Sequence, residues 1–124
     1  MTDAHAFFAG KRCLVLEDEF LIALDVCQTL EAAGAAVTCF GDAAEALQAL
    51  QGGAPFDLAV LDLKLSGRDS TGVAALLTER ATPFVFLTGM RPDDVRSFPR
   101  APVVEKPYKV EALMDALRKA LGDH

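Results

Sequence analysis

Four short apolar runs in this chain each end in polar or charged residues, and this repetition constrains the fold more than any other feature. The polar residues at the run ends are Glu17, Asp18 and Glu19, then Asp62, then Thr88, and last Glu105 and Lys106. Longer segments with helical spacing of apolar residues separate the runs, which indicates βαβ units and a parallel sheet. Because ligands bind beyond the carboxyl ends of the strands in such a sheet, we expect these side chains to share one edge.

The apolar periodicity predicts five strands and four helices. The expected strands are Arg12–Leu16, Ala36–Phe40, Leu58–Leu61, Phe84–Leu87 and Val103–Glu105. The expected helices are Phe20–Ala33, Ala43–Gln51, Gly72–Arg80 and Lys109–Leu121. Glycines are expected to end three of these helices, namely Gly34, Gly52-Gly53 and Gly122. Asp42 is expected to cap the second helix at its start. Right-handed crossovers between the strands then give a three-layer α/β sandwich.

The stretch between the fourth and fifth strands interrupts this pattern. Pro92 suits the first turn of a helix, but Pro99 and Pro102 limit any helix there to about two turns. We therefore expect a short or partly ordered fourth helix within residues 91–102.

The length and charge of the chain narrow the classes of function. A length of 124 residues corresponds to one domain, and no repeat or linker divides it. The formal net charge of −6 argues against nucleic acid or an anionic membrane as a direct partner. The apolar stretches are too short to span a bilayer, and the first residues do not resemble a signal peptide. We expect a cytoplasmic protein with one domain over residues 1–124, rather than a piece cut from a longer regulator.

The cysteines and histidines suggest no chemistry of their own. Cys13, Cys27 and Cys39 match no zinc-binding spacing. We expect them to be reduced and to act as small apolar side chains, rather than to form a disulfide, a metal site or a nucleophile. His5 and His124 lie in terminal segments, where we expect tail disorder rather than metal binding or phosphorylation.

Two of the acids at the strand ends, Asp18 and Asp62, are expected to face one crevice from neighbouring strands. Close carboxylates repel each other unless a proton or a cation neutralises them. Mg²⁺ suits such a place, because it keeps several waters and takes few carboxylates together with a phosphate oxygen. For any single acid, a helix cap or a turn is the simpler interpretation. The recurrence of acids, Thr88 and Lys106 at four strand ends favours a shared site.

Four pieces of the sequence together resemble the receiver domain of the two-component response-regulator family. They are Val15-Leu16-Glu17-Asp18-Glu19, Asp57-Leu58-Ala59-Val60-Leu61-Asp62, Phe86-Leu87-Thr88-Gly89 and Glu105-Lys106-Pro107-Tyr108. Their order and spacing carry the resemblance over a core of residues 11–121. The resemblance implies a flavodoxin-like, doubly wound parallel sheet in the strand order 2-1-3-4-5. It also implies a phosphoprotein of two-component signal transduction.

The resemblance assigns a phosphoacceptor and a metal site. Asp62 would take a phosphoryl group from a phosphohistidine of a sensor histidine kinase or a histidine phosphotransferase. Mg²⁺ would be bound by Asp18, by Glu17 directly or through water, by Asp62, and by the backbone carbonyl of Lys64.

The resemblance also assigns the groups that would contact the phosphoryl oxygens. Lys106 would pair with them, the Thr88 hydroxyl would hydrogen-bond one of them, and Gly89 would leave room beside Thr88. Phosphorylation would draw Thr88 and Lys106 inward and bias the segment after the fourth strand toward a second arrangement. Such a protein is not an enzyme in the usual sense, although it catalyses its own phosphorylation and dephosphorylation. It would act as a phosphorelay component, a phosphate sink or a switch that binds a downstream protein.

Two departures from the common receiver pattern stand out at the fourth and fifth strands. The position that usually carries a Phe or Tyr three residues before the lysine is Val103, so the usual aromatic switch is absent. Phe86-Leu87-Thr88-Gly89-Met90 resembles a stand-alone receiver subgroup with a Phe-Ala-Thr-Gly motif and a mobile fourth helix. Leu87 replaces the alanine of that motif, and Arg91 stands where an aromatic residue is common.

The loop after Asp62 also departs from the pattern. Ser66 replaces a frequent proline, and Gly72 falls later than the usual glycine, which indicates a lengthened loop. The Lys64 side chain either tunes the lifetime of the phosphorylated state or is a solvated surface lysine.

Three apolar residues of the first helix, Phe20, Leu21 and Leu24, lie off its core stripe. By resemblance to the family, this face would receive a histidine-bearing helical partner. Partial burial against neighbouring elements is the alternative.

Two other functions compete with a phosphorylated receiver. One is a Mg²⁺-dependent phosphohydrolase of the haloacid dehalogenase type, which needs an Asp two residues after the nucleophile, where this chain has Lys64. The other is a receiver-like protein-interaction module that works without phosphorylation. Phosphate incorporation in the presence of Mg²⁺ separates this module from a working receiver.

Overall fold

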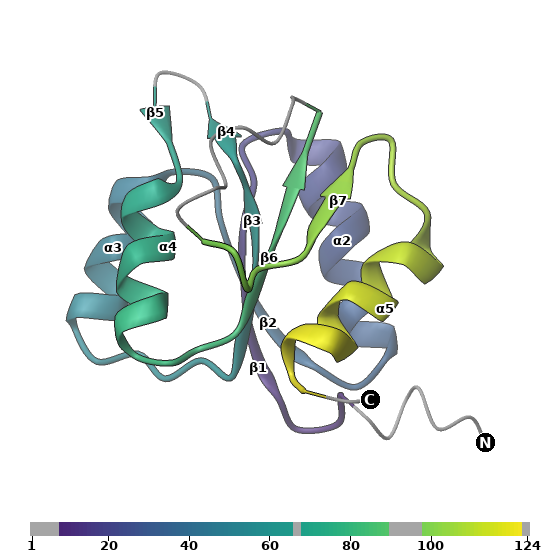
Figure 1. The fold of residues 1–124 in the computed structure, drawn as a ribbon, viewed down its shortest axis with the longest axis horizontal. Helices are drawn as coiled ribbons and strands as arrows, with labels where there is room; N and C mark the ends of the chain where they lie inside the picture. The colour runs from purple at the N-terminus through teal and green to yellow at the C-terminus, as the bar shows by residue number, and fades with distance from the viewer. Residues whose placement is uncertain (1–7, 66–67, 90–97, 123–124) are drawn as a thin grey trace.

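A central sheet of five parallel strands organises the chain (Figure 1). The computed structural model describes residues 8–65, 68–89 and 98–122. The strands are β1 (Arg12–Leu16), β2 (Ala36–Phe40), β3 (Leu58–Asp62), β6 (Phe84–Thr88) and β7 (Val103–Glu105). Their order in the sheet is β2-β1-β3-β6-β7, which confirms the predicted order 2-1-3-4-5 of a flavodoxin-like fold.

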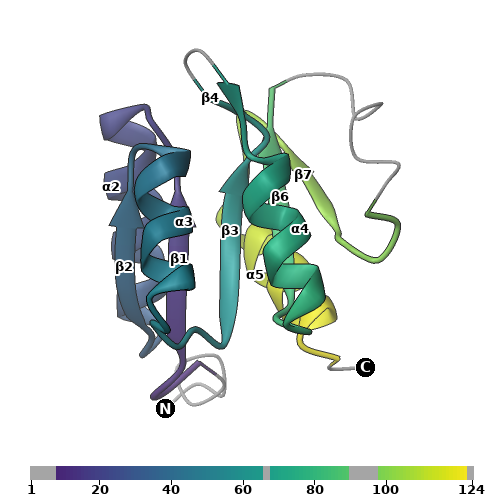
Figure 2. The same ribbon diagram turned by 90° about the vertical axis from the view of Figure 1, so that its left-hand side faces the viewer.

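Two helices cover each face of this sheet, so the three-layer prediction is also confirmed. The helices are α2 (Phe20–Ala32), α3 (Ala43–Gln51), α4 (Thr71–Glu79) and α5 (Val110–Ala120). Helices α2 and α5 lie on one face, and α3 and α4 lie on the other; Figure 2 shows the second pair in front of the strands. Each helix begins and ends within one residue of its predicted bounds.

The core consists of two apolar layers, one on each side of the sheet. Along β1, Cys13 and Val15 join the layer under α2 and α5, whereas Leu14 and Leu16 join the layer under α3 and α4. Both faces of β3 and β6 are buried, which explains their uninterrupted apolar sequences.

The predicted helix ends are confirmed where the backbone geometry tests them. The Asp42 side chain accepts a hydrogen bond of 2.8 Å from the Ala44 backbone N–H, as a helix cap does. Gly34 and Gly122 follow the ends of α2 and α5 at φ values of 98° and 87°, a region that glycine adopts without strain.

A short hairpin was not expected from the sequence. Strand β4 (Lys64–Leu65) pairs with β5 (Arg68–Asp69) in an antiparallel ladder directly after β3. The expected fourth helix falls largely on residues 90–97, which lie outside the described residues, as do His5 and His124. Among the described helices, none combines the length and the apolar character that a bilayer span requires.

The prediction that all three cysteines are reduced is wrong for two of them. Cys27 of α2 and Cys39 of β2 form a disulfide, whereas Cys13 is free and buried. Helix α2 packs beside β2, so the two cysteines meet although they are twelve positions apart in the sequence. Burial raises the pKa of the Cys13 thiol to about 12, so this cysteine remains a protonated apolar side chain.

Candidate functional site

The carboxyl ends of four strands bring the predicted site residues to one edge of the sheet. Glu17 follows β1 directly, Asp62 ends β3, Thr88 ends β6, and Lys106 follows β7. Backbone hydrogen bonds fix these ends, since the Lys106 N–H donates to the Thr88 carbonyl at 2.8 Å. The expectation that these residues share one edge is confirmed.

Three carboxylates form the acidic part of this site. Glu17, Asp18 and Asp62 each offer an oxygen, and the three oxygens lie within 4.8 Å of one another. Glu17 and Asp62 are buried, at 3 % and 4 % exposure, and Asp18 is half-buried. Negative charges this close and this poorly hydrated repel strongly, so the site favours a cation or a proton.

Lys106 supplies a positive charge to the same site. Its Nζ atom lies 3.0 Å from Glu17 Oε1, 3.4 Å from Asp62 Oδ2 and 3.4 Å from Glu19 Oε1. Only 15 % of the Lys106 side chain is exposed, so these contacts are shielded from water more than surface ion pairs are.

The electrostatics of the site shift the pKa of Asp62 upward. This pKa is raised to about 7, first by burial and then by the neighbouring Glu17 carboxylate, while Lys106 partly opposes the rise. Burial lowers the pKa of Lys106, but its contact with Glu17 and the charge of Asp62 outweigh this effect and raise the pKa overall. Lys106 therefore stays charged. Any further positive charge nearby would stabilise the ionised form of Asp62.

Thr88 and Gly89 border the acidic group where β6 ends. Thr88 is completely buried, and Glu105 lies opposite it in the ladder between β6 and β7. A Cβ atom on Gly89 would lie 3.9 Å from the Lys106 Cβ, which is ordinary van der Waals contact. Gly89 therefore lies beside Lys106, and its predicted role, to leave room for a phosphoryl group beside Thr88, stays a prediction.

Lys64 begins β4 two residues after Asp62. Its backbone is fixed by the pairing of Lys64 with Asp69 in the β4–β5 hairpin. The predicted use of its carbonyl as a metal ligand is untested, and its side chain lies outside the described part of the chain.

The donor set fits a small divalent cation. The three potential ligands, Glu17, Asp18 and Asp62, all offer carboxylate oxygens, which Mg²⁺ prefers. Glu17 Oε1 is buried and accepts no hydrogen bond from the described residues, although Lys106 Nζ lies 3.0 Å away. This contact is therefore an ion pair without hydrogen-bond geometry, and the oxygen retains capacity for a further ligand.

Glu19 is a part of the site that the sequence interpretation did not assign. The sequence places it among the acids beyond the first strand but predicts no role for it. The structure places its side chain, 64 % exposed, within hydrogen-bonding distance of Lys106. A glutamate at a helix N-cap, where Ser, Thr, Asp or Asn is favoured, is the signal that could have drawn notice to it.

The apolar residues off the core stripe of α2 are exposed. Phe20 is 75 % exposed, Leu21 76 % and Leu24 42 %. The alternative that they are partly buried against neighbouring elements is wrong for Phe20 and Leu21. They are the first two residues of α2, directly after Glu19, so this apolar surface adjoins the acidic site.

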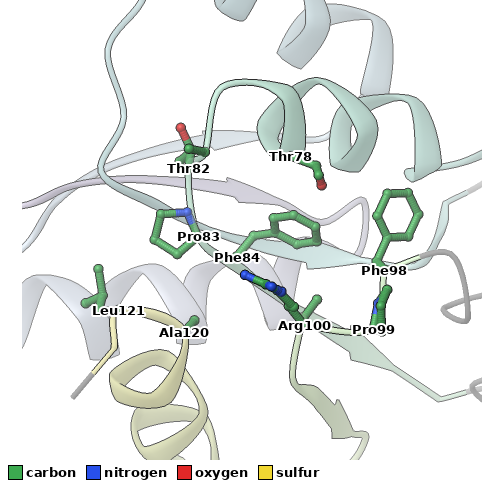
Figure 3. A pocket seen from close by; sticks show the side chains of 11 residues that line it. Thr78, Thr82, Pro83, Phe84, Phe98, Pro99, Arg100, Ala120 and Leu121 are labelled. Carbon is green, nitrogen blue, oxygen red and sulfur yellow. The ribbon is translucent and has the colours of Figure 1, made fainter. Parts of the chain in front are cut away.

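A cavity of about 710 Å³ lies at the other edge of the sheet, where the strands begin. Its wall includes Pro83 and Phe84 at the start of β6, together with Phe98, Arg100 and Leu121 (Figure 3). None of the predicted site residues lines it. The cavity is therefore separate from the acidic site.

The chain is similar in sequence to a known regulatory protein. No protein-family model matches the chain. The chain is 30 % identical over 127 residues to the transcriptional regulatory protein PdtaR of Mycobacterium tuberculosis, a match that covers 98 % of this chain and 61 % of PdtaR. The chain thus spans less than two thirds of the length of that curated relative.

Solved structures are similar over nearly the whole chain. A response regulator receiver protein from Sinorhizobium medicae WSM419 is 29 % identical with a TM-score of 0.84, over 90 % of this chain and 94 % of that one. SdrG from Sphingomonas melonis Fr1 is 37 % identical with a TM-score of 0.76, over 90 % of this chain and 96 % of that one. The chain therefore has the receiver-domain fold of response regulators.

Proposed function

We propose that this chain is a response-regulator receiver that accepts a phosphoryl group on Asp62. The donor would be a phosphohistidine on a sensor histidine kinase or a histidine phosphotransferase. The observation that supports this most strongly is the convergence of buried Asp62 with Glu17, Asp18 and the Lys106 ammonium at one edge of the sheet. The receiver fold of the similar structures agrees with it.

The proposed reaction is an in-line displacement at phosphorus. An Asp62 carboxylate oxygen forms the new P–O bond while the P–N bond to the imidazole breaks. The imidazole nitrogen keeps the bonding electron pair, and one proton taken up leaves the ring neutral. Because the carboxylate does the chemistry itself, the protein contributes positioning and neutralisation of charge.

Mg²⁺ would be held by Glu17, Asp18, Asp62 and the Lys64 carbonyl. When bound, it supplies positive charge to the carboxylates and to the phosphoryl oxygens. Glu17 Oε1 has capacity for a ligand that the described residues do not provide, which supports a cation at this place.

Lys106 and Thr88 would recognise the transferred group. Lys106 already contacts Asp62, so a short movement would bring its ammonium to a phosphoryl oxygen. Thr88 ends β6 beside Gly89, so its displacement would reach the segment that follows Gly89. This is the proposed switch, with output as a phosphorelay component, a phosphate sink or a contact with a downstream protein.

The exposed apolar face of α2 supports a protein phosphodonor. Phe20 and Leu21 lie directly beyond Glu19, close to the acidic site, where a histidine-bearing helix would dock. A Leu21→Asp variant should fold, accept phosphate from acetyl phosphate normally, and accept it slowly from its kinase. Transfer from the kinase at the full rate would exclude docking at this face.

The rival functions are weaker. A haloacid-dehalogenase-type phosphohydrolase needs an acid where this chain has Lys64, and Lys106 is the group beside Asp62. A receiver-like module that works without phosphorylation would not need the Mg²⁺-compatible acids. Membership of the Phe-Ala-Thr-Gly subgroup stays a prediction from the residues after β6.

Phosphate incorporation from acetyl phosphate and Mg²⁺ tests the proposal. We expect the wild-type chain to gain one phosphoryl group by intact mass, and Asp62→Asn to gain none. Asp57→Asn, which changes an aspartate at the other end of β3, should be labelled like the wild type. Equal labelling of Asp62→Asn and the wild type would exclude Asp62 as the acceptor, and absence of labelling in the wild type would favour the phosphorylation-independent module.

A further inference from the structure

The contact between Glu19 and Lys106 is not explained by the architecture of α2. Glu19 is the N-cap residue of α2, and its carbonyl accepts the first helical hydrogen bond from the Ala23 N–H at 2.9 Å. Its side chain makes no capping hydrogen bond. Instead, it reaches Lys106 Nζ at 3.4 Å, across 87 positions of the sequence.

The Lys106 ammonium contacts acidic side chains from the ends of two strands. Glu19 and Glu17 approach its ammonium from the end of β1, while Asp62 approaches from the end of β3 at 3.4 Å. The Glu19 N–H also donates to Glu17 Oε2 at 3.1 Å, so the two glutamates are held together by the backbone. Glu19 and Glu17 therefore compete with Asp62 for the one ammonium of Lys106.

We infer that Glu19 is a positioning residue that holds Lys106 on the β1 side of the acidic site and so restrains phosphorylation of Asp62. This inference rests on the proposed function. A phosphoryl group on Asp62 would draw the Lys106 ammonium toward its oxygens, and the Glu19 contact would oppose that movement. Because Glu19 is largely exposed, water screens the contact, and its effect on rate is modest.

The inference differs from simple repulsion between Glu19 and an anionic phosphodonor. Repulsion depends on the charge at this position, whereas positioning depends on contact with the ammonium. Glu19→Asp separates the two, because it keeps the charge and shortens the side chain by about 1.5 Å. Glu19→Gln removes the charge and the ion pair together.

The test compares rates of phosphorylation by acetyl phosphate at saturating Mg²⁺ for the wild type and five variants, one of them a double substitution. We expect Glu19→Gln and Glu19→Asp each to be phosphorylated about two- to fivefold faster than the wild type. Glu31→Gln, which removes the same charge from the last turn of the same helix, should match the wild type. In a Lys106→Gln background, adding Glu19→Gln should change nothing, because the group that it positions is gone.

Binding of beryllofluoride, a non-transferable stand-in for the phosphoryl group, supplies a second readout. Glu19→Gln and Glu19→Asp should both bind it about two- to fivefold more tightly than the wild type. A Glu19→Asp variant that behaves like the wild type would overturn the inference in favour of charge repulsion. A Glu19→Gln variant equal to the wild type, or one whose effect survives in the Lys106→Gln background, would overturn it too.

These outcomes separate the inference from the function on which it rests. A wild-type chain that takes up phosphate on Asp62, with unchanged Glu19 variants, would retain the proposed function and remove the role of Glu19. A wild-type chain that neither takes up phosphate nor binds beryllofluoride would remove both.

Discussion

The two edges of the central sheet are built on opposite physical principles. Near the edge where the strands begin, the rings of Phe84 and Phe98 pack edge to face with each other and with Phe86 in the middle of β6, with centroids 5.4–6.0 Å apart. At the edge where they end, Glu17 and Asp62 are buried together with one lysine between them. One edge gains stability from apolar contacts, and the other keeps like charges close in a poorly hydrated place.

This difference indicates which edge is maintained for function. Burying paired carboxylates raises the free energy of the folded state unless a cation or a proton compensates. An edge optimised for stability alone would carry apolar residues at its buried positions, as the Phe84, Phe86 and Phe98 cluster does. Substitutions should therefore have opposite effects at the two edges.

The largest expected effect is at the aromatic edge. Phe84→Ala removes a ring that is only 6 % exposed and that contacts Phe86 and Phe98. We expect a loss of about 3 kcal/mol in the free energy of unfolding, measured by urea denaturation. Phe84→Leu, which retains most of the apolar volume, should lose about 1 kcal/mol. If Phe84→Ala lost less free energy of unfolding than Phe84→Leu, the aromatic cluster would not be what stabilises this edge.

The second expected effect is a gain in the free energy of unfolding, on substitution of Asp62. The pKa of Asp62 is about 7 in the folded chain and near its ordinary value in the unfolded chain. Between these values the folded state binds more protons, so its stability falls as the pH rises from about 4 to about 7. Without Mg²⁺, Asp62→Asn should therefore be more stable than the wild type at pH 8, on the order of 1–3 kcal/mol, with the gain vanishing near pH 4.

Asp57→Asn is the matched control for this pH dependence. The hydrogen bond and charge of Arg12 lower the pKa of Asp57, so ionised Asp57 contributes stability above its unfolded pKa. That contribution is lost as the pH falls, and Asp57→Asn should lose stability at pH 8 where Asp62→Asn gains it. Two aspartate substitutions at opposite ends of β3 that shift stability in the same direction would contradict the comparison.

The smallest expected effect comes from Mg²⁺ itself. A cation bound between Glu17, Asp18 and Asp62 should raise the melting temperature, by an amount equivalent to about 1.4 kcal/mol at ten times its dissociation constant. Asp18→Asn should lose this stabilisation, whereas Glu31→Gln should keep it. If Mg²⁺ stabilised the wild type, Asp18→Asn and Glu31→Gln equally, the cation would bind at another site.

The sequence predicted the sheet and the position of its acidic edge because both depend on periodicity. Apolar runs that end in Asp62, Thr88 and Lys106 define strand ends, and a parallel sheet brings such ends to one side. The helix bounds followed from apolar spacing and from residues such as Asp42 and Gly34 whose preferences are local.

Features that depend on contacts between distant segments could not be predicted in this way. The Cys27–Cys39 disulfide depends on how α2 packs beside β2, and no spacing rule encodes it. The β4–β5 hairpin has strands of two residues, too short to show alternation. Glu19 looked like an ordinary charged residue at a helix start, because its partner Lys106 lies at the far end of the chain.

Trapping the phosphorylated residue tests the central claim most directly. Borohydride reduces an aspartyl phosphate to homoserine, so treatment after incubation with acetyl phosphate and Mg²⁺ marks the acceptor for peptide mass mapping. We predict homoserine at position 62, and none when Mg²⁺ is chelated. Homoserine at another aspartate, or at none, would contradict the account.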